Sequence, residues 1–270
     1  MPDLSADFGP AKRVAFLGGI YSNYLALEKS LELARAAKVD AIVALGDFGA
    51  FGPHPDRTVE ILREANIPAI QGNYEESLST AAEDCHCGYT DPRDNAFAQI
   101  SYDYTGAKTS PEHKKWMGTL PTAATMTLGA TKLRLCHGSP RTINEFLWET
   151  TTPVPFVEKV LRAQDADVLV CTHTGIHWKR MTARNRGIVN VGALGRPPND
   201  GKTGVWFAIL EEKSGAIDAE FVPVEYDHTR LAREMTAEKL PKEFVETIET
   251  GWWTTCLEIL PAKERSRGRY

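Results

Sequence analysis

The first 70 residues alternate short apolar runs with segments of helical periodicity. Residues 14–17 and 41–45 are continuous apolar runs, which is typical of strands buried on both faces. Residues 24–37 and 56–65 repeat apolar side chains at helical spacing, and Pro68 to Ile70 predicts a third strand. Strand, helix and strand at this spacing predict βαβ units, and therefore a parallel sheet with right-handed crossovers.

The rest of the chain has a different pattern. Residues 76–99 contain many turn formers and predict a long irregular stretch, and Ser110 then caps a helix. Strand-like runs follow and predict a second sheet packed on the first; they cover residues 133–136, 168–171, 188–191, 204–210 and 219–224. From Asp227 onward the pattern is helical, and we expect the adjacent Trp252 and Trp253 to dock on the core of the same domain.

Length and charge limit the class of protein. A chain of 270 residues with 42% hydrophobic and 25% charged residues predicts one globular domain over 1–270, with 227–270 as a helical C-terminal extension. No apolar run approaches the roughly 18 residues of a membrane span, and Met1 to Arg13 lacks the apolar core of a signal peptide, so we expect a cytoplasmic protein without membrane association. The net charge of -5 argues against binding nucleic acid as a polymer.

The cysteine pattern does not indicate a disulfide framework. The chain has 5 cysteines, an odd number, and is long enough to build a core without disulfide bonds. We expect reduced thiols, and consider Cys85 and Cys87 separately below because a single residue divides them.

Polar side chains stand directly after four of the apolar runs. They are Asp47, Asn73, His137 and His173. Taken singly, such an Asp caps a helix, such an Asn makes a turn and a lone His is most often hydrogen-bonded in the core. In open α/β sheets, however, ligands bind where strands end. One carboxylate, one amide oxygen and two imidazoles form a mixed set of ligands that suits Zn, Mn or Fe.

Five short motifs in sequence order resemble those of the calcineurin-like metallophosphoesterases, in particular the small bacterial phosphodiesterase branch. The motifs are Gly19-Ile20-Tyr21, Gly46-Asp47, Gly72-Asn73-Tyr74-Glu75, His137-Gly138 and Thr172-His173-Thr174-Gly175. The resemblance covers roughly residues 13 to 250. It implies a four-layer α/β/β/α sandwich, in which two mixed sheets are flanked by helices, and a site for two metal ions.

The resemblance implies that one of these two metal positions is complete and the other is emptied. Asp47, Asn73, His137 and His173 correspond to the family's full ligand set for one metal. The private ligands of the other metal correspond to Gly19, Tyr21 and Gly175, none of which is the family's residue. The family's third motif also carries a His that contacts the phosphate and helps to protonate the leaving group, and here that residue is Tyr74.

The emptied position leaves three alternatives open. In the first, other residues hold a second metal, and the candidates are Cys85, His86 and Cys87, with His177 and the Tyr21 oxygen in addition. In the second, the enzyme works with a single metal. In the third, catalysis is lost and the pocket binds a phosphorylated ligand or a protein partner.

We prefer hydrolysis of a phosphate monoester or diester by metal-activated water, acting on a small phosphorylated substrate. Besides the metal ligands, Tyr74, Asn73 and Tyr21 are the candidate catalytic residues. A phenol donates a hydrogen bond but is a poor proton shuttle at neutral pH.

Four residues are candidate phosphate-binding groups. Gly19 and Asn23 precede a predicted helix, where free backbone N–H groups attract anions. Arg141 or Arg196 could bind a phosphate oxygen bidentately. The sequence leaves the substrate, the native metal and a possible homo-oligomer open.

Overall fold

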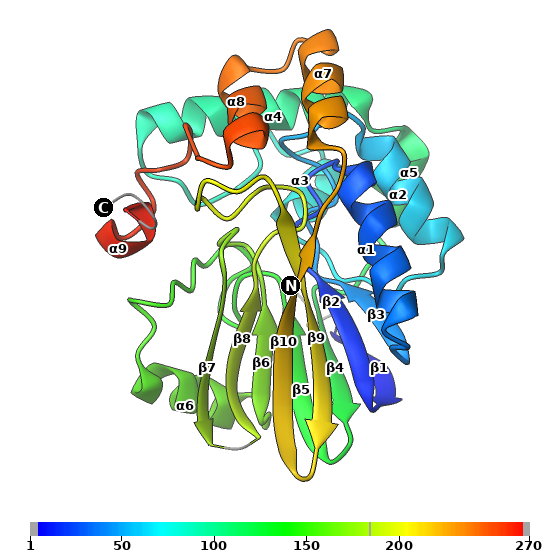
Figure 1. Cartoon of the computed structure of the whole chain (residues 1–270), viewed down its shortest axis with the longest axis vertical. Helices are drawn as coiled ribbons and strands as arrows, with labels where there is room; N and C mark the ends of the chain where they lie inside the picture. The colour runs from blue at the N-terminus through cyan, green and yellow to red at the C-terminus, as the bar shows by residue number, and fades with distance from the viewer. Residues whose placement is uncertain (1–4, 184, 267–270) are drawn as a thin grey trace.

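Two β-sheets pack face to face with helices outside them in the computed structural model, which describes residues 5–183 and 185–266 (Figure 1). The larger sheet has the order β1 (Ser5–Ala11), β4 (Ala123–Leu128), β5 (Thr131–Cys136), β6 (Val168–Cys171), β8 (Arg186–Val191) and β7 (His177–Ala183). The smaller sheet has the order β10 (Ala216–Val224), β9 (Val205–Lys213), β2 (Arg13–Leu17) and β3 (Ala41–Ala44). Both sheets are mixed, since each combines parallel and antiparallel pairs.

Strand β2 shows why its sequence is continuously apolar. Val14 and Phe16 point into the core between the two sheets, whereas Ala15 and Leu17 point into a second core under the outer helices. Successive side chains of a strand face opposite sides, so a strand between two cores needs apolar residues at every position. The predicted four-layer α/β/β/α sandwich is confirmed.

The helices form the outer layers. Helices α1 (Tyr24–Ala36) and α2 (Pro55–Glu64) contribute to the core that covers the smaller sheet, and α6 (Val154–Ala163) packs on the larger sheet. The remaining helices are α3 (Asn73–Thr80), α4 (Pro92–Lys108), α5 (Pro111–Met117), α7 (His228–Ala237), α8 (Lys242–Thr250) and α9 (Ala262–Arg265). None of the helices in the described ranges is long and apolar enough to cross a bilayer.

The structure differs from the sequence expectations in several elements. Residues 204–210 and 219–224 belong to β9 and β10, which return to the first sheet instead of extending the second. The expected third strand at Pro68 to Ile70 is reduced to one bridge between Ala44 and Ala69. Residues 76–99 are not irregular throughout, because α3 and α4 occupy both ends of that stretch. Asp91 explains the second helix, since its side chain accepts hydrogen bonds from the first turn of α4.

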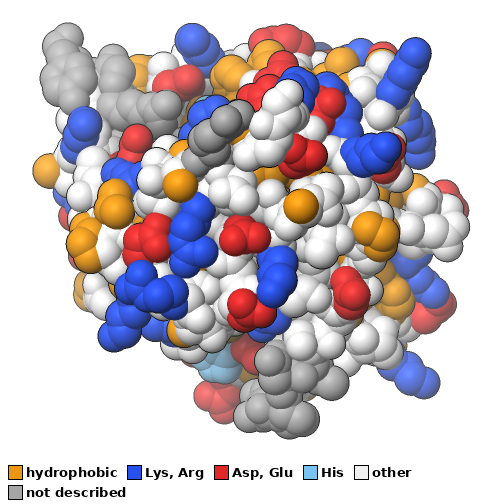
Figure 2. Space-filling model, turned by 90° about the horizontal axis from the view of Figure 1, so that it is seen from below, with side chains coloured by type: hydrophobic (Ala, Val, Ile, Leu, Met, Phe, Trp, Pro, Cys, Tyr) orange, Lys and Arg blue, Asp and Glu red, His pale blue; other side chains and the backbone are white. Residues whose placement is uncertain are grey.

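Charged side chains of both signs are mixed on the surface. Figure 2 shows acidic and basic groups interspersed on one face, with no broad basic patch among the described residues of that face. This distribution agrees with the net charge of -5.

The C-terminal segment docks on the chain's own core through Trp253. This side chain is 4% exposed, and its Nε1 donates a hydrogen bond to the Pro197 carbonyl oxygen. Its ring covers Gly175, where an added Cβ would lie 2.9 Å from the Trp253 Cη2 atom. The expectation that the tryptophan pair docks on this domain is confirmed for Trp253.

Replacing Gly175 by alanine should destabilise the fold more than the same change at Gly215. Both glycines have φ of +73°, a left-handed conformation that costs other residues roughly 1–2 kcal/mol. Gly215 has open space around its Cβ position, whereas at Gly175 a methyl group would meet Trp253, and overpacking costs about 1–3 kcal/mol more. The free energies of unfolding from urea denaturation measure the difference, and equal losses in Gly175→Ala and Gly215→Ala would contradict the tight Trp253 contact.

Candidate metal centre

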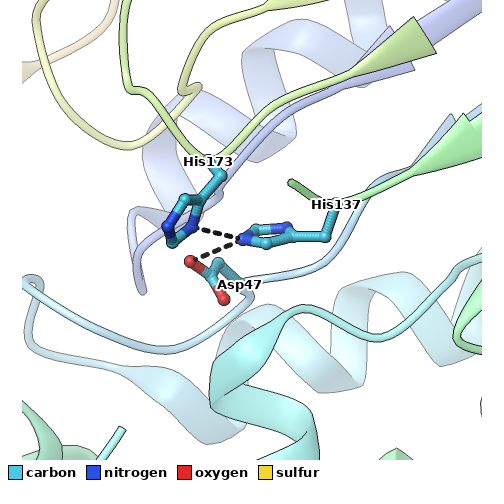
Figure 3. A group of neighbouring side chains, drawn as sticks. All are labelled: Asp47, His137 and His173. Carbon is cyan, nitrogen blue, oxygen red and sulfur yellow. Dashed lines mark hydrogen bonds and ion pairs between the residues drawn. The ribbon is translucent and has the colours of Figure 1, made fainter. Parts of the chain in front are cut away.

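Three buried side chains converge at the carboxyl ends of three strands (Figure 3). Asp47 follows β3, His137 follows β5 and His173 follows β6. The His137 Nε2 atom lies 3.2 Å from Asp47 Oδ2 and 3.0 Å from His173 Nδ1. Potential ligand atoms of all three residues lie within 4.8 Å of one another, which is close enough for one metal ion to bind them together.

Neighbouring groups orient the two imidazoles. The His137 Nδ1 atom lies 2.7 Å from the Leu45 carbonyl oxygen, and a carbonyl can only accept, so Nδ1 is the donor and Nε2 faces the site. Such an outer contact is the usual way in which a protein fixes the tautomer of a ligating histidine. The His173 Nδ1 atom faces the same point, while its Nε2 atom is buried without a hydrogen-bond partner.

Asn73 is the fourth predicted ligand, and its backbone lies beside Asp47. It begins α3, and the backbone N–H of the next residue lies 3.2 Å from Asp47 Oδ1, which brings the start of α3 against Asp47. The Asn73 Nδ2 atom donates to the Cys85 carbonyl oxygen at 2.8 Å, whereas Oδ1 is buried without a partner. A buried oxygen without a partner is unfavourable, and a bound metal ion would satisfy it. The donor set therefore fits a divalent metal.

Glu75 holds the two loops of the site together. Its carboxylate accepts hydrogen bonds from the backbone N–H groups of Asp47 at 2.7 Å, Phe48 at 2.9 Å and Gly72 at 2.8 Å. These contacts support Asp47 in its left-handed conformation, with φ of 56°. Burial, together with the nearby negative charge of Asp47, raises the pKa of Glu75 to about 7. Glu75 is not among the site residues predicted from the sequence, although it stands within the third motif.

The charges of the metal-free centre depend on one another. Burial would raise the pKa of Asp47, but His137 and His173 hold it below its usual value. Burial would likewise lower the pKa of His137, but the Asp47 carboxylate raises it above its usual value. Burial and the adjacent His137 lower the pKa of His173 to about 3, so this imidazole is neutral at pH 7 and can offer a lone pair to a metal.

Aromatic rings cover the emptied positions. A Cβ atom added at Gly19 would lie 2.5 Å from Cε1 of Tyr21, so the Tyr21 ring occupies the space that a longer side chain at residue 19 would need. Trp253 covers Gly175 in the same way. Burial, then the charge of Asp47, raises the pKa of Tyr21, so its phenol is protonated at neutral pH where no metal ion is bound. The suggestion that the Tyr21 oxygen ligates a second metal stays a prediction.

The Cys85-His86-Cys87 segment does not form the alternative metal site considered above. Cys85 and Cys87 are joined by a disulfide bond, so neither offers a thiolate, and the expectation of reduced thiols is wrong for this pair. His86 is exposed, and its Nδ1 atom lies 3.4 Å from the hydroxyl of Ser77. The other three cysteines are buried and free, as expected.

His177 lies outside the metal cluster found among the described residues. Its ring packs against Trp206 and Phe221, with centroid distances of 4.8 and 4.6 Å. These contacts give His177 a packing role at the start of β7.

The predicted phosphate-binding residues separate into two groups. Asn23 caps α1 by accepting from the Ala26 N–H, and Arg141 forms an ion pair with Glu145 on the surface. The Gly19 N–H faces the Thr172 hydroxyl at 3.4 Å. Arg196, in contrast, is buried.

A cavity of about 60 Å³ adjoins the metal centre. Asp47 and His173 form part of its wall, and Tyr21, Tyr74 and Arg196 form another part. The remainder of the wall is mainly apolar and aromatic and includes Phe51, Tyr89, Phe97 and Phe244. The Tyr74 hydroxyl contacts the Ser101 hydroxyl at 2.9 Å. Of the candidate arginines, the structure therefore brings Arg196 to the same cavity as the metal-binding side chains.

Comparison with known proteins agrees with this geometry. A curated relative, an uncharacterised protein of Methanocaldococcus jannaschii, is 24% identical over 253 residues, which cover 88% of this chain and 98% of the relative. The crystal structure of a hypothetical protein of Pyrococcus horikoshii has the same fold, with a TM-score of 0.75 at 22% identity over 90% of this chain and 99% of that chain.

A metallophosphoesterase from Sphaerobacter thermophilus is also similar. Its crystal structure matches with a TM-score of 0.67 and 25% identity, covering 89% of this chain and 99% of that chain. The profile of the calcineurin-like phosphoesterase superfamily domain matches residues 13–215. The chain therefore belongs to the calcineurin-like phosphoesterase superfamily.

Proposed function

We propose that the protein is a phosphoesterase that works with one divalent metal ion, Mn, Fe or Zn, held by Asp47, Asn73, His137 and His173. The observation that carries the proposal is the convergence of His137 Nε2, His173 Nδ1 and an Asp47 carboxylate oxygen at one buried point. The Asn73 Oδ1 atom, which has no hydrogen-bond partner, would add an amide oxygen as the fourth ligand, and these metals accept oxygen ligands.

The side chains around this point have distinct tasks. A bound divalent ion would polarise a phosphoryl oxygen and lower the pKa of a water molecule. The Asp47 carboxylate balances part of the positive charge, and Glu75 keeps Asp47 in place through the backbone. Burial raises the pKa of Tyr74, so its phenol stays protonated and acts as a hydrogen-bond donor, not as a base.

A second candidate function is a binding protein without catalysis on the same fold. The observation that favours it is the covering of Gly19 and Gly175 by aromatic rings, which a longer ligand side chain at either position would have to displace. A two-metal clamp stabilises both the attacking and the leaving oxygen, and a single metal does less. The buried Asp47 and His137 pair favours the enzyme, because it has the ligands and orientation that a metal needs.

Metal content should depend on His137 and be independent of His86. We expect one metal ion per wild-type chain and a loss of affinity of at least about 10–100-fold in His137→Ala, since even outer partners of a ligand have effects of that size. His86→Ala is the matched control, because this histidine is exposed and lies outside the cluster.

Elemental analysis of the purified variants measures the metal, and turnover of an aryl phosphomonoester and an aryl phosphodiester measures the activity. A wild-type chain that holds no Mn, Fe or Zn would refute the proposed metal site. A chain that holds metal but gives no turnover above buffer would favour the binding protein.

The double variant Cys85→Ser/Cys87→Ser should keep its metal. The disulfide removes both thiolates from consideration. The shorter contact of Asn73 Nδ2 with this segment, 2.8 Å to the Cys85 carbonyl oxygen, is retained in the variant, and a serine hydroxyl at residue 87 can accept in place of the sulfur that lies 3.4 Å away. Elemental analysis before and after the change measures the effect. A substantial fall in metal per chain would return these cysteines to the ligand set.

Metal binding should release a proton at acidic pH. The Asp47 carboxylate raises the pKa of His137, so below that pKa the metal-free imidazole carries a proton on the nitrogen that faces the site. A metal must displace this proton, so affinity should fall as pH falls. Calorimetric titrations at pH 6 and pH 9 in buffers of different ionisation enthalpy count the protons. Equal release at both pH values would show that His137 is not the group that titrates.

A further inference from the structure

Arg196 is a buried cation without an anionic partner among the described residues. Arg196 is 6% exposed, and its Nη2 atom donates a hydrogen bond to the Thr255 carbonyl oxygen at 2.8 Å. Its Nε atom is buried without a hydrogen-bond partner. A buried charge is unfavourable unless it is paired, so an unpaired guanidinium beside a cavity indicates that the pair is completed by something that binds there.

Aromatic rings hold this guanidinium in place. The Arg196 guanidinium carbon lies 3.9 Å from the centroid of the Trp253 ring and 5.0 Å from that of Phe51. Such contacts stabilise a cation without neutralising its charge. The Trp253 ring also lies against Gly175. The same ring therefore fills the space beside one replaced ligand position and stacks on the positively charged guanidinium of Arg196.

Arg196 lines the same cavity as two of the proposed metal ligands. Arg196, Asp47 and His173 form the wall of the same cavity, and Tyr21, whose ring covers Gly19, lines it too. The emptied half of the site therefore contains a fixed positive charge in addition to its packed rings. A guanidinium keeps its charge at every physiological pH and binds two oxygens of one phosphate through its planar fork.

We infer that Arg196 binds the phosphoryl group of the substrate opposite the metal, so that a metal ion and a guanidinium together form the anion site, and that the substrate is a phosphate monoester. This inference rests on the proposed metal site. One of the three terminal phosphoryl oxygens would face the ion that Asp47 and His173 help to hold, and another would face Arg196.

Charge favours a monoester over a diester. Among the groups that line the cavity, a bound divalent ion and Arg196 would supply three positive charges and Asp47 one negative charge. This excess of positive charge attracts the dianion of a terminal phosphate more strongly than the single negative charge of a diester.

The test measures binding of inorganic phosphate to the metal-loaded full chain. Arg196→Met should weaken phosphate binding by at least about tenfold, the usual effect of losing hydrogen bonds to a charged group, while the metal content stays at the wild-type value. Arg141→Met is the matched control, because Arg141 is also an arginine of the predicted phosphate-binding set but lies exposed in an ion pair with Glu145. It should leave phosphate affinity unchanged.

Folded, metal-loaded Arg196→Met that binds phosphate as wild type does would overturn the inference. If this variant does not fold, the wild-type chain still tests the substrate class. Its kcat/KM for an aryl phosphomonoester should exceed its kcat/KM for the matching diester. The reverse order would overturn the monoester assignment. A wild-type chain without metal refutes the proposed metal site instead, and phosphate binding by that metal-free chain, lost in Arg196→Met, would still support the role of Arg196.

Discussion

The contact on which the site depends is the buried carboxylate of Glu75. It joins the loop after β3 to the start of α3, because it accepts hydrogen bonds from the backbone N–H groups of Asp47 and Phe48 in the loop and of Gly72 at the helix start. Asp47 projects from the first of these segments and Asn73 from the second, so one side chain sets the separation of two metal-binding groups that lie far apart in sequence. The histidines come from strands of the other sheet, and the metal centre therefore lies where the two sheets meet.

The emptied half of the site is a packed structure and not a deletion. Gly19 and Tyr21 act as a pair, because the ring of Tyr21 fills the volume that a side chain on Gly19 would need. Gly175 and Trp253 form a second pair of the same kind. A longer side chain placed at either glycine alone would meet an aromatic ring, so packing around Gly19 and Gly175 favours the small residues found there.

The sequence allowed the cluster of Asp47, His137 and His173 to be predicted because strand ends in a parallel arrangement converge, and all three residues follow apolar runs. It did not reveal the Cys85–Cys87 disulfide, since a short spacing fits a disulfide, a metal site or an ordinary loop equally well. Strand β1 escaped prediction because Gly9 and Pro10 interrupt it, which an edge strand tolerates. The covering of Gly175 by Trp253 joins residues too distant in sequence for any local pattern to indicate.

The docked C-terminal segment contributes contacts to Arg196 from outside the part of the chain that matches the superfamily. The match to the superfamily ends at residue 215 and includes every metal-binding side chain, whereas Trp253 and Thr255, which hold the Arg196 guanidinium, lie beyond it. The candidate metal ligands and two of the residues that hold the Arg196 guanidinium therefore lie in separate stretches of sequence. Changes in the last segment can therefore alter how Arg196 is held without touching the candidate ligands, and a nascent chain synthesises those ligands before Trp253 and Thr255.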